Sequence, residues 1–510
     1  MGPSTLLRPA TPTFLRLPLA AGVLVAVGAC QGAIGDGEPE PEVPPPAEVE
    51  PIAVPANLET LTSEGYCVDL AAGETLRSVS PEGHAWLVAQ NGVASDLRVL
   101  DPFDPSAETT DSLELGSLSR LQAWSEMDAA AIADDSLWQI DHMARVQLAP
   151  PTGFSADAEL CGDPTTNGAL LYGGELVERR EDDQWWGWNP GTTGNAAPSQ
   201  LLRFQGECAG PDDNVWMTSP DGTLWRVEPA SVYRPVRFEG YRSAAITSAS
   251  GSEVMIGVLA EDRLWAGASE WQPYTFDRGT PELVSAASGA LWTVVDDHLL
   301  RFDGTTWNEV GLPDGASGID GVEAHAGGAW LTAGDQVCHV ALGPMLRVTG
   351  IRPYLRSKEL DYTFTVASDD AGATISASLD GESLTLSDDG VSVTGKARLD
   401  EVGWHELVVA AGETERSIFV KRIPEEIRSW AEDVEPIYQA NCTGSDCHVA
   451  GGSATAPDLS TYETWTALAA KIRTRVVVAK TMPPTANQGP DWGEEQVAII
   501  AQWLEGGMAP

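Results

Sequence analysis

The sequence predicts a multidomain, mainly β chain that ends in a small all-α domain. The 510 residues include 51 Gly and 35 Pro, which interrupt helices, and 18 Trp against 9 Phe, and tryptophan suits half-buried strands. Short apolar segments recur about every 40 residues through much of the chain, whereas the last 87 residues have the spacing of helices. A chain of this length is expected to form several domains.

Acidic side chains outnumber basic ones by 75 to 30, which gives a formal charge of −45. A nucleic-acid-binding surface requires a basic face, so this balance excludes nucleic acid as a partner. Charged residues make up 21% and hydrophobic residues 43%, which are ordinary proportions for a globular protein and exclude general disorder. We interpret the excess of acids as a solubility bias.

Residues 1–29 have the pattern of a secretory signal peptide. Arg8 and Arg16 precede the apolar stretch 17–29, and no acidic residue occurs before Asp36. The stretch is short for a transmembrane anchor, which is the alternative. Residues 30–58 are rich in Pro and Glu and predict an extended tether.

The end of the signal segment, Val27-Gly28-Ala29-Cys30, resembles a bacterial lipoprotein box. The resemblance implies that Cys30 becomes the lipidated first residue and is the only attachment to a membrane. Because Gln31 rather than Asp follows, it also implies an exported protein retained at the outer membrane. Such a compartment is oxidising and permits disulfides.

Residues 59–345 contain seven short repeats, whose strands are centred near Trp86, Ala131, Leu171, Trp216, Val254, Trp292 and Trp330. The last four centres are 38 residues apart. Asp-Asp or Asp-Gly turns lead into a second strand, which is a hairpin signal. Seven such units predict a seven-bladed β-propeller, with a linear β-solenoid as the alternative. The segment Asp303-Gly304-Thr305-Thr306-Trp307 resembles the blades of the two-component-regulator class of propellers.

Two cysteines test whether the repeats form a ring. Cys67 precedes the first complete unit and Cys338 lies in the last, so a disulfide between them would join the two ends of the array, as a ring allows and a solenoid does not. Cys161 and Cys208 would then form the second pair. The pairing stays open, because four cysteines allow three arrangements.

The repeat region contains no recognisable catalytic set, and its ligand is unknown. We interpret its single histidines as packing residues: His84, His142, His298, His325 and His339. Tryptophans within residues 182–190 lie next to Asp and Asn and suit a sugar or peptide ligand, but we favour core packing for them.

Residues 346–423 predict a small β-sandwich. Alternating segments such as 362–366 and 373–378 are separated by turns at Asp380-Gly381 and at 388–390. About seven strands resemble an immunoglobulin-like sandwich without its disulfide, which implies a spacer. We interpret His405 as a packing residue.

Residues 424–510 carry the motif with the clearest chemistry. Cys442 and Cys447 are followed directly by His448, the attachment pattern of c-type haem, in which two thiols bind the haem covalently and the imidazole ligates iron. Four residues separate the cysteines instead of the usual two. The alternatives are a disulfide between Cys442 and Cys447 and a zinc site, which lacks a fourth donor because no Cys or His follows His448.

The flanking segments resemble a small single-haem cytochrome c. The resemblance implies one haem c per chain, with the carbonyl of Pro457 holding the Nδ1–H of His448 and with Met482 as the sixth ligand. Met508 is the alternative ligand, although we expect it in a frayed terminus. A first helix is expected to begin at residues 423–426 and to bury Trp430, Val434 and Ile437, and a final helix to bury Val497, Ile500 and Trp503.

The last 87 residues contain 12 acidic and 5 basic side chains. Four of the basic ones cluster: Lys471, Arg473, Arg475 and Lys480. They suit either the haem propionates or a solvated helix face.

These observations lead to the hypothesis of an exported, membrane-anchored c-type cytochrome that transfers single electrons. It would exchange electrons with a redox protein or a small donor or acceptor, and would be an electron carrier rather than an enzyme. The propeller would bind a partner or act as a scaffold. One alternative is a surface recognition lipoprotein whose propeller binds glycan or protein, with a structural or sensory haem. The other is a quinoprotein-like propeller dehydrogenase with the haem as internal electron acceptor.

Overall fold

The computed structural model describes residues 49–510 apart from single residues and short segments (93, 105, 142–143, 152–153, 166–168, 174–175, 182–183, 188–199, 204–213, 220–221, 229–230, 249–253, 268–269, 371, 389–391, 413, 425–427, 444–447, 450–457, 479, 484–491, 506–507 and 509–510). The predicted signal peptide, Cys30 and the first part of the tether lie outside the described residues. So do His142, Cys208, Cys447 and Pro457. Within the described residues, no helix is long and apolar enough to cross a membrane.

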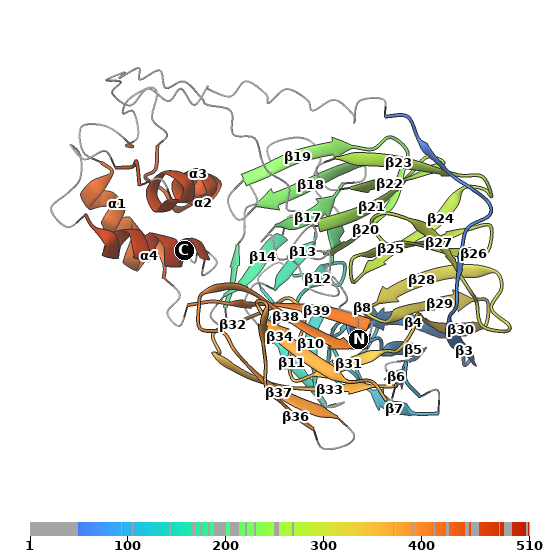
Figure 1. Cartoon of the computed structure of the whole chain (residues 1–510). Helices are drawn as coiled ribbons and strands as arrows, with labels where there is room; N and C mark the ends of the chain where they lie inside the picture. The colour runs from blue at the N-terminus through green and yellow to red at the C-terminus, as the bar shows by residue number, and fades with distance from the viewer. Residues whose placement is uncertain are drawn as a thin grey trace, which may run out of the picture.

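The chain is mainly β, as predicted, and the described residues of its first part form seven sheets (Figure 1). Each sheet has four antiparallel strands, and two of the sheets gain a fifth, parallel strand at the edge. The first sheet contains β4 (Glu74–Val79), β5 (Ala85–Asn91), β6 (Ala94–Leu100) and β7 (Glu108–Leu113), and the second contains β8 (Leu118–Ala123), β9 (Ala129–Ala133), β10 (Ser136–Asp141) and β11 (Ala144–Leu148). The third contains β12 (Glu159–Cys161), β13 (Leu170–Gly173), β14 (Leu176–Glu181) and β15 (Gln184–Gly187). The fourth contains β16 (Gln200–Leu202), β17 (Val215–Thr218), β18 (Thr223–Glu228) and β19 (Ser231–Arg237). The other three are β20 (Tyr241–Ser248), β21 (Val254–Ala260), β22 (Arg263–Gly267) and β23 (Trp271–Phe276); β24 (Pro281–Ala287), β25 (Ala290–Val295), β26 (His298–Phe302) and β27 (Trp307–Val310); and β28 (Ile319–His325), β29 (Gly328–Ala333), β30 (Gln336–Ala341) and β3 (Glu64–Asp69).

The first strands of the seven sheets form a closed, propeller-like ring. Each contacts the first strand of the next sheet, and β28 in the last sheet contacts β4 in the first. Every predicted repeat centre lies in the second strand of a sheet, from Trp86 in β5 to Trp330 in β29. These strands are buried between neighbouring sheets, and all five residues of β9 are buried, because alanine side chains allow sheets to pack closely.

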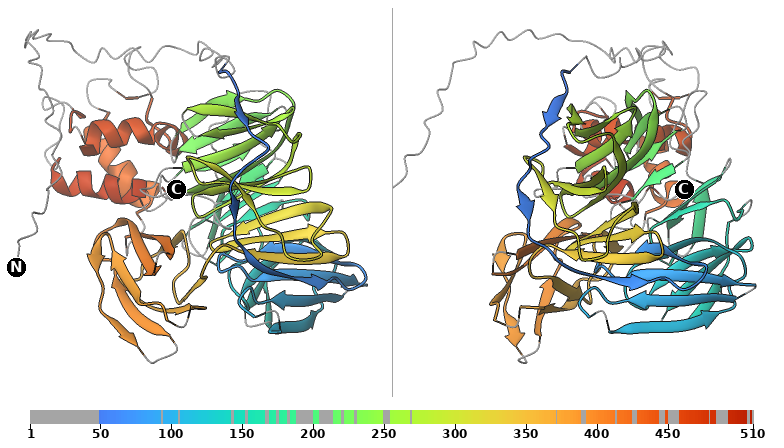
Figure 2. Two further views of the ribbon diagram at one scale, coloured as in Figure 1. Left: turned by 45° about the vertical axis from the view of Figure 1, so that its right-hand side comes forward. Right: turned by 90° about the vertical axis from the view of Figure 1, so that its right-hand side faces the viewer.

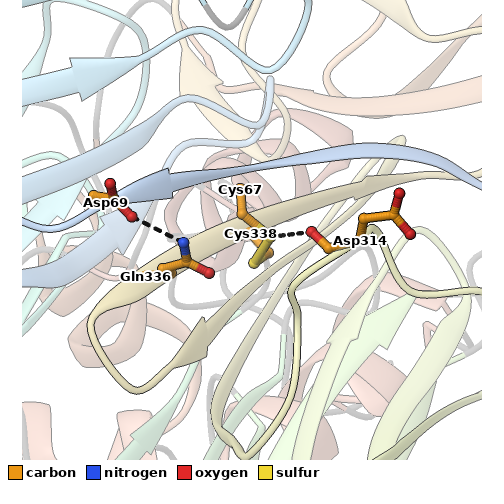
Figure 3. The surroundings of a disulfide bond; sticks show 5 residues. All are labelled: Cys67, Asp69, Asp314, Gln336 and Cys338. Atoms are coloured by element: carbon orange, nitrogen blue, oxygen red, sulfur yellow. Dashed lines mark hydrogen bonds between the residues drawn. A yellow bond between two sulfur atoms is a disulfide. The ribbon is translucent and has the colours of Figure 1, made fainter.

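The ring is completed by β3, a strand from the N-terminal side of the repeats. It pairs antiparallel with β30, and Cys67 lies directly opposite Cys338 in the register. A disulfide joins the two, with their Cα atoms 4.0 Å apart (Figure 3). The Gln336 side chain also donates a hydrogen bond to the Asp69 carboxylate at 2.8 Å. Cys161 is disulfide-bonded as well, while its expected partner lies outside the described residues.

A strap, which we define as residues 52–69, runs along the outer edges of three consecutive sheets (Figure 2). Its first strand, β1 (Ile52–Val54), pairs parallel with β23, and β2 (Thr60–Leu61) pairs parallel with β27, before β3 joins β30. Val54 is only 3% exposed and packs in the apolar core between the fifth and sixth sheets. Residue 58, the predicted end of the tether, therefore lies within the strap, since burial of Val54 ties the chain to the ring earlier.

The segment after the ring is a two-sheet sandwich around one apolar core. One sheet contains β31 (Leu346–Thr349), β33 (Asp361–Ser368), β37 (Val393–Arg398) and β36 (Leu386–Asp388); the other contains β32 (Leu355–Ser357), β39 (Thr414–Arg422), β38 (Gly403–Ala411), β34 (Ile375–Leu379) and β35 (Glu382–Ser383). Along β33, Tyr362, Phe364 and Val366 are buried in alternation, as the pattern predicts. His405 bonds Asp380 and the Glu401 carbonyl, both at 2.7 Å, which is a structural arrangement.

The C-terminal part is helical. It contains two π-helical turns, η2 (Trp430–Val434) and η4 (Arg473–Val478), together with α1 (Glu435–Asn441), α2 (Tyr462–Ala467), α3 (Ala469–Ile472) and α4 (Glu494–Glu505).

The first helical segment begins at Trp430 and not at residues 423–426 as predicted. Ile423 is still part of the sandwich, because it is buried and its N–H donates to the Ser357 carbonyl. Ser429 supplies the cap: its hydroxyl accepts from the Glu432 N–H at 3.0 Å, and the Asp433 carboxylate accepts from the Ser429 N–H at 2.8 Å. This reciprocal capping defines the start of the helical segment at Trp430.

Replacing Cys67 and Cys338 together by serine should lower the free energy of unfolding by roughly 2–5 kcal/mol, because the disulfide restrains a loop of 271 residues in the unfolded chain. Urea unfolding under non-reducing conditions measures this loss. The ring should still close, since the backbone pairing of β3 with β30 remains. Replacing Cys161 and Cys208 is the control; they would enclose a shorter loop, and an equal or larger loss there would contradict the prediction.

Candidate functional site

The site is built around α1, which brings Cys442 to its end. The helix buries Ile437 and Tyr438 against the core of the helical region, so its direction is fixed. Cys442 is the C-cap residue, and its N–H donates to the Tyr438 carbonyl at 2.8 Å. It is a half-buried thiol that packs against the same core.

His448 is held in place through its main chain. Its carbonyl accepts a hydrogen bond from the Tyr438 hydroxyl at 2.9 Å and another from the Leu459 N–H at 3.0 Å. Burial raises the pKa of Tyr438, with smaller contributions from Asp458 and other acidic neighbours, so this hydroxyl remains a donor. The helix that ends at Cys442 therefore also anchors the candidate iron ligand.

Met482 follows η4 in the chain and packs against the same core. The N–H groups of Thr481 and Met482 both donate to the Arg475 carbonyl, at 2.7 and 3.1 Å. The Met482 side chain is half-buried and packs against the same core as Cys442. The main chain of the basic segment thus positions the residue predicted as sixth ligand.

Met508 does not lie in a frayed terminus, and this expectation is wrong. Its side chain is 2% exposed within the core, its N–H donates to the Trp503 carbonyl at 2.9 Å, and its carbonyl accepts from the Tyr462 hydroxyl at 3.0 Å. The two bonds and the apolar burial hold Met508 in place. The Met482 side chain is therefore the more exposed of the two methionines.

A cluster of buried aromatic rings forms the centre of the helical region. Trp465 lies 5.1 Å from Trp430 and 6.0 Å from Trp503, measured between ring centroids. A rim of half-buried apolar side chains surrounds it, including Cys442, Leu468, Met482, Trp492 and Val497. Such a rim gains stability when another apolar body covers it.

The chemistry of these donors fits a c-type haem. A thiol, an imidazole and a thioether are the groups that such a haem uses for attachment and axial ligation. Cys442, His448 and Met482 are all half-buried, so each keeps a surface that the group can cover. Among the described residues there is no cluster of three or more His, Cys, Asp or Glu side chains suited to another metal site.

The predicted basic cluster lies beside this loop and is exposed. Lys471 lies in α3, Arg473 and Arg475 belong to η4, and Lys480 precedes the Met482 loop. The Lys480 ammonium is 3.7 Å from the Glu494 carboxylate, a weak exposed pair.

Three histidines of the ring lie together, which no sequence pattern indicated. His84, His325 and His339 were each interpreted as isolated, yet all three are buried and meet where the first and last sheets adjoin. No local pattern signals this, because only closure of the ring brings the first repeat beside the last. The anchoring role of Tyr438 was missed for a similar reason.

No protein-family model matches this chain, and no curated protein matches it. Among solved structures, the extracellular domain of BT4673 from B. thetaiotaomicron, described as a one-component system, is 10% identical with a TM-score of 0.38, and the match covers 72% of this chain. The chain spans 58% of the length of that domain. Hsv2p of Kluyveromyces lactis is 8% identical with a TM-score of 0.31, covering 64% of this chain and 98% of that one. Likenesses this weak assign neither a family nor a function.

Replacing Tyr438 by phenylalanine should destabilise the segment around His448 by about 1 kcal/mol, because one hydrogen bond is lost while the ring stays packed. Amide hydrogen exchange at His448 and Leu459 measures the effect. Tyr462→Phe is the matched control: it removes the bond to Met508 and should leave exchange at His448 unchanged. Equal effects of the two variants at His448 would contradict the anchoring role.

Proposed function

We propose that this chain is an exported, lipid-anchored c-type cytochrome that carries single electrons. The observation that carries the proposal is the position of Cys442 and His448: one ends α1, and the other is tied to α1 by the Tyr438 hydroxyl. Cys447 would supply the second thioether and Pro457 the support for the imidazole, both from the cytochrome c resemblance.

A haem bound here would supply an iron centre that gains and loses one electron. Cys442 would hold the group covalently, His448 would ligate the iron, and Met482 would provide a soft thioether that favours the ferrous state. The two hydrogen bonds to the Arg475 carbonyl would orient the Met482 loop. The apolar rim, with Leu468, Trp492 and Val497, would exclude water and so favour electron transfer over ligand chemistry.

The disulfide and zinc alternatives have less support. The disulfide alternative needs Cys442 bonded to Cys447, which lies outside the described residues, and it gives no role to His448. The described residues offer no cluster of three His, Cys or acidic side chains, and zinc requires four ligands.

We further propose that the ring is a seven-bladed β-propeller and the sandwich an immunoglobulin-like spacer. Support comes from the seven sheets, the contact between β28 and β4, and the single core shared by both sheets of the sandwich. Their role would be to position the electron-carrying region or to bind its partner, a redox protein or a small donor or acceptor. The lipid on Cys30 would anchor the assembly at the outer membrane.

The decisive experiment is the reduced-minus-oxidised absorption spectrum of the protein, produced in a host that attaches haem c. We expect a covalently bound, low-spin haem that is reduced and reoxidised reversibly. A colourless protein with a disulfide between Cys442 and Cys447 would falsify the proposal. A haem that is redox-inert under titration would instead favour the structural or sensory alternative.

Met482→Ala should remove the sixth ligand and convert the haem to a high-spin form, which the absorption spectrum reports directly. Met508→Ala is the matched control. Because Met508 is buried, that variant should cost about 2–5 kcal/mol of stability yet leave the spectrum low-spin. A high-spin spectrum in the Met508 variant alone would show that the ligand assignment is reversed.

A further inference from the structure

The sandwich is docked on one face of the ring through a set of charged contacts. The Arg347 guanidinium, on β31, lies 2.6 Å from the Asp101 carboxylate, and Arg352 lies 2.9 Å from the Asp163 carboxylate. Asp101 follows β6 in the first sheet, and Asp163 follows β12 in the third. The Tyr354 hydroxyl bonds Ser248, at the end of β20 in the fifth sheet. Contacts with sheets on different sides of the ring place the sandwich across this face (Figure 2).

Arg416, on β39 of the sandwich, is buried at the centre of this contact. It is 5% exposed, and its guanidinium donates to the carbonyls of Leu346 at 3.2 Å and Pro81 at 3.4 Å. The Glu82 carboxylate of the ring is buried and attracts it. The loop between β4 and β5, residues 80–84, therefore forms the ring side of the contact.

Three buried imidazoles lie directly behind this contact. His84 belongs to the same loop, and its Nδ1 is 3.2 Å from the Ser80 hydroxyl. His325 and His339 stack on each other with their Nε2 atoms 3.0 Å apart. The Gly327 N–H donates to His325 Nδ1 at 3.3 Å, so that atom is an acceptor and His325 carries its proton on Nε2. With that proton on His325 Nε2, His339 Nε2 must be the acceptor, so the bonds of these two rings require neutral His325 and neutral His339.

We propose that the contact between sandwich and ring is an acid-sensitive latch, which neutral His84, His325 and His339 hold closed and their protonation opens. Protonated His325 cannot accept the Gly327 N–H, and protonated His339 cannot accept from His325 Nε2. A proton on His84 adds positive charge near Arg347, and a proton on His325 adds it near Arg416, and both arginines belong to the sandwich.

The histidines are coupled to the sandwich by two short routes. Through loop 80–84, a shift of His84 would move Pro81 and Glu82, which are partners of Arg416 on the ring side. The second route runs through Gly327, whose N–H bonds His325. Gly327 packs closely against Met345: a Cβ atom added to Gly327 would lie 3.0 Å from the Met345 side chain. Met345 begins the segment that enters the sandwich, so a change at His325 is transmitted to the docked domain.

The charged groups that face the latch come from several elements. Asp101 and Arg347 act on His84, and Asp101 also acts on His339. His84 and Arg416 act on His325, while Arg416 and Arg352 act on Glu82. Asp101 is the one that favours protonation of His84 and His339. It is already paired with Arg347, which offsets its effect.

Burial sets the direction of the pH response. It lowers the pKa of His84 to about 4, that of His339 to about 3, and that of His325 well below its usual value. In a released, solvated state these pKa values return toward about 6.5. The latch is therefore fully closed above about pH 6.5, and each histidine shifts the equilibrium toward release by up to about tenfold per pH unit below it. Burial raises the pKa of Glu82, so acid favours the closed state at this one group. This effect opposes the three histidines, each of which favours release.

Hydrogen exchange of the full mature chain between about pH 7 and about pH 4.5 tests the latch. On acidification we expect residues 80–84 and 345–354 to lose protection reversibly while β38 and β39 in the sandwich core remain protected. Simultaneous loss of protection in β38 would mean that acid unfolds the sandwich rather than releasing it, and would overturn the proposal. Unchanged protection at all these residues would overturn it as well.

His84→Asn removes one titrating group and keeps an acceptor for the Ser80 hydroxyl, so the midpoint of release should move to lower pH. His339→Gln provides a second variant should the first fail to fold. The matched control is His298→Asn, because His298 is half-exposed beside Glu309 on a different part of the ring. An equal shift in the control, or no shift in either latch variant, would refute a role for the buried histidines.

Discussion

The pairing of β3 with β30 is the interaction on which the rest of the structure depends. It is made by residues at opposite ends of the repeat array, and it turns seven sheets that each contact only their neighbours into a closed ring. Closure places the loop of residues 80–84 beside His325 and His339, and it brings the loops of several sheets to one face. On this face, three sandwich residues find partners on three different sheets of the ring: Arg347, Arg352 and Tyr354.

Features encoded by short-range patterns were predictable from the sequence. The seven repeat centres lie in second strands because apolar alternation and Asp-rich turns specify hairpins locally. The disulfide between Cys67 and Cys338 could be expected for a closed ring, because the order of the repeats alone places these cysteines at the two ends of the array. The start of the first helix was not, because Pro424 resembles a helix start while the competing signal, the sandwich contact of Ile423, depends on tertiary structure.

The candidate site shows the same division. Cys442 and His448 are recognisable because the motif is contiguous, and Met482 because its loop resembles that of a family. The burial of Met508 was missed, because a terminal position says nothing about the Tyr462 and Trp503 groups that bind its main chain. The histidine cluster needs the first and last repeats to meet, and a sequence pattern contains no such information until the ring is built.

The strap has a mechanical consequence for a protein held by its N-terminal end. A pull on that end acts first on β1 and β2, which have three and two paired residues, so these short strands would peel away under low force. The load then reaches β3, where Cys67 is covalently joined to Cys338. The pairs of Glu64, Gly65 and Tyr66 with β30 would carry the load before Cys67, but from Cys67 the force passes into β30 through a covalent bond, and the rest of the chain beyond it is spared. The disulfide would thus separate any tension applied at the N-terminal side from the closure of the ring.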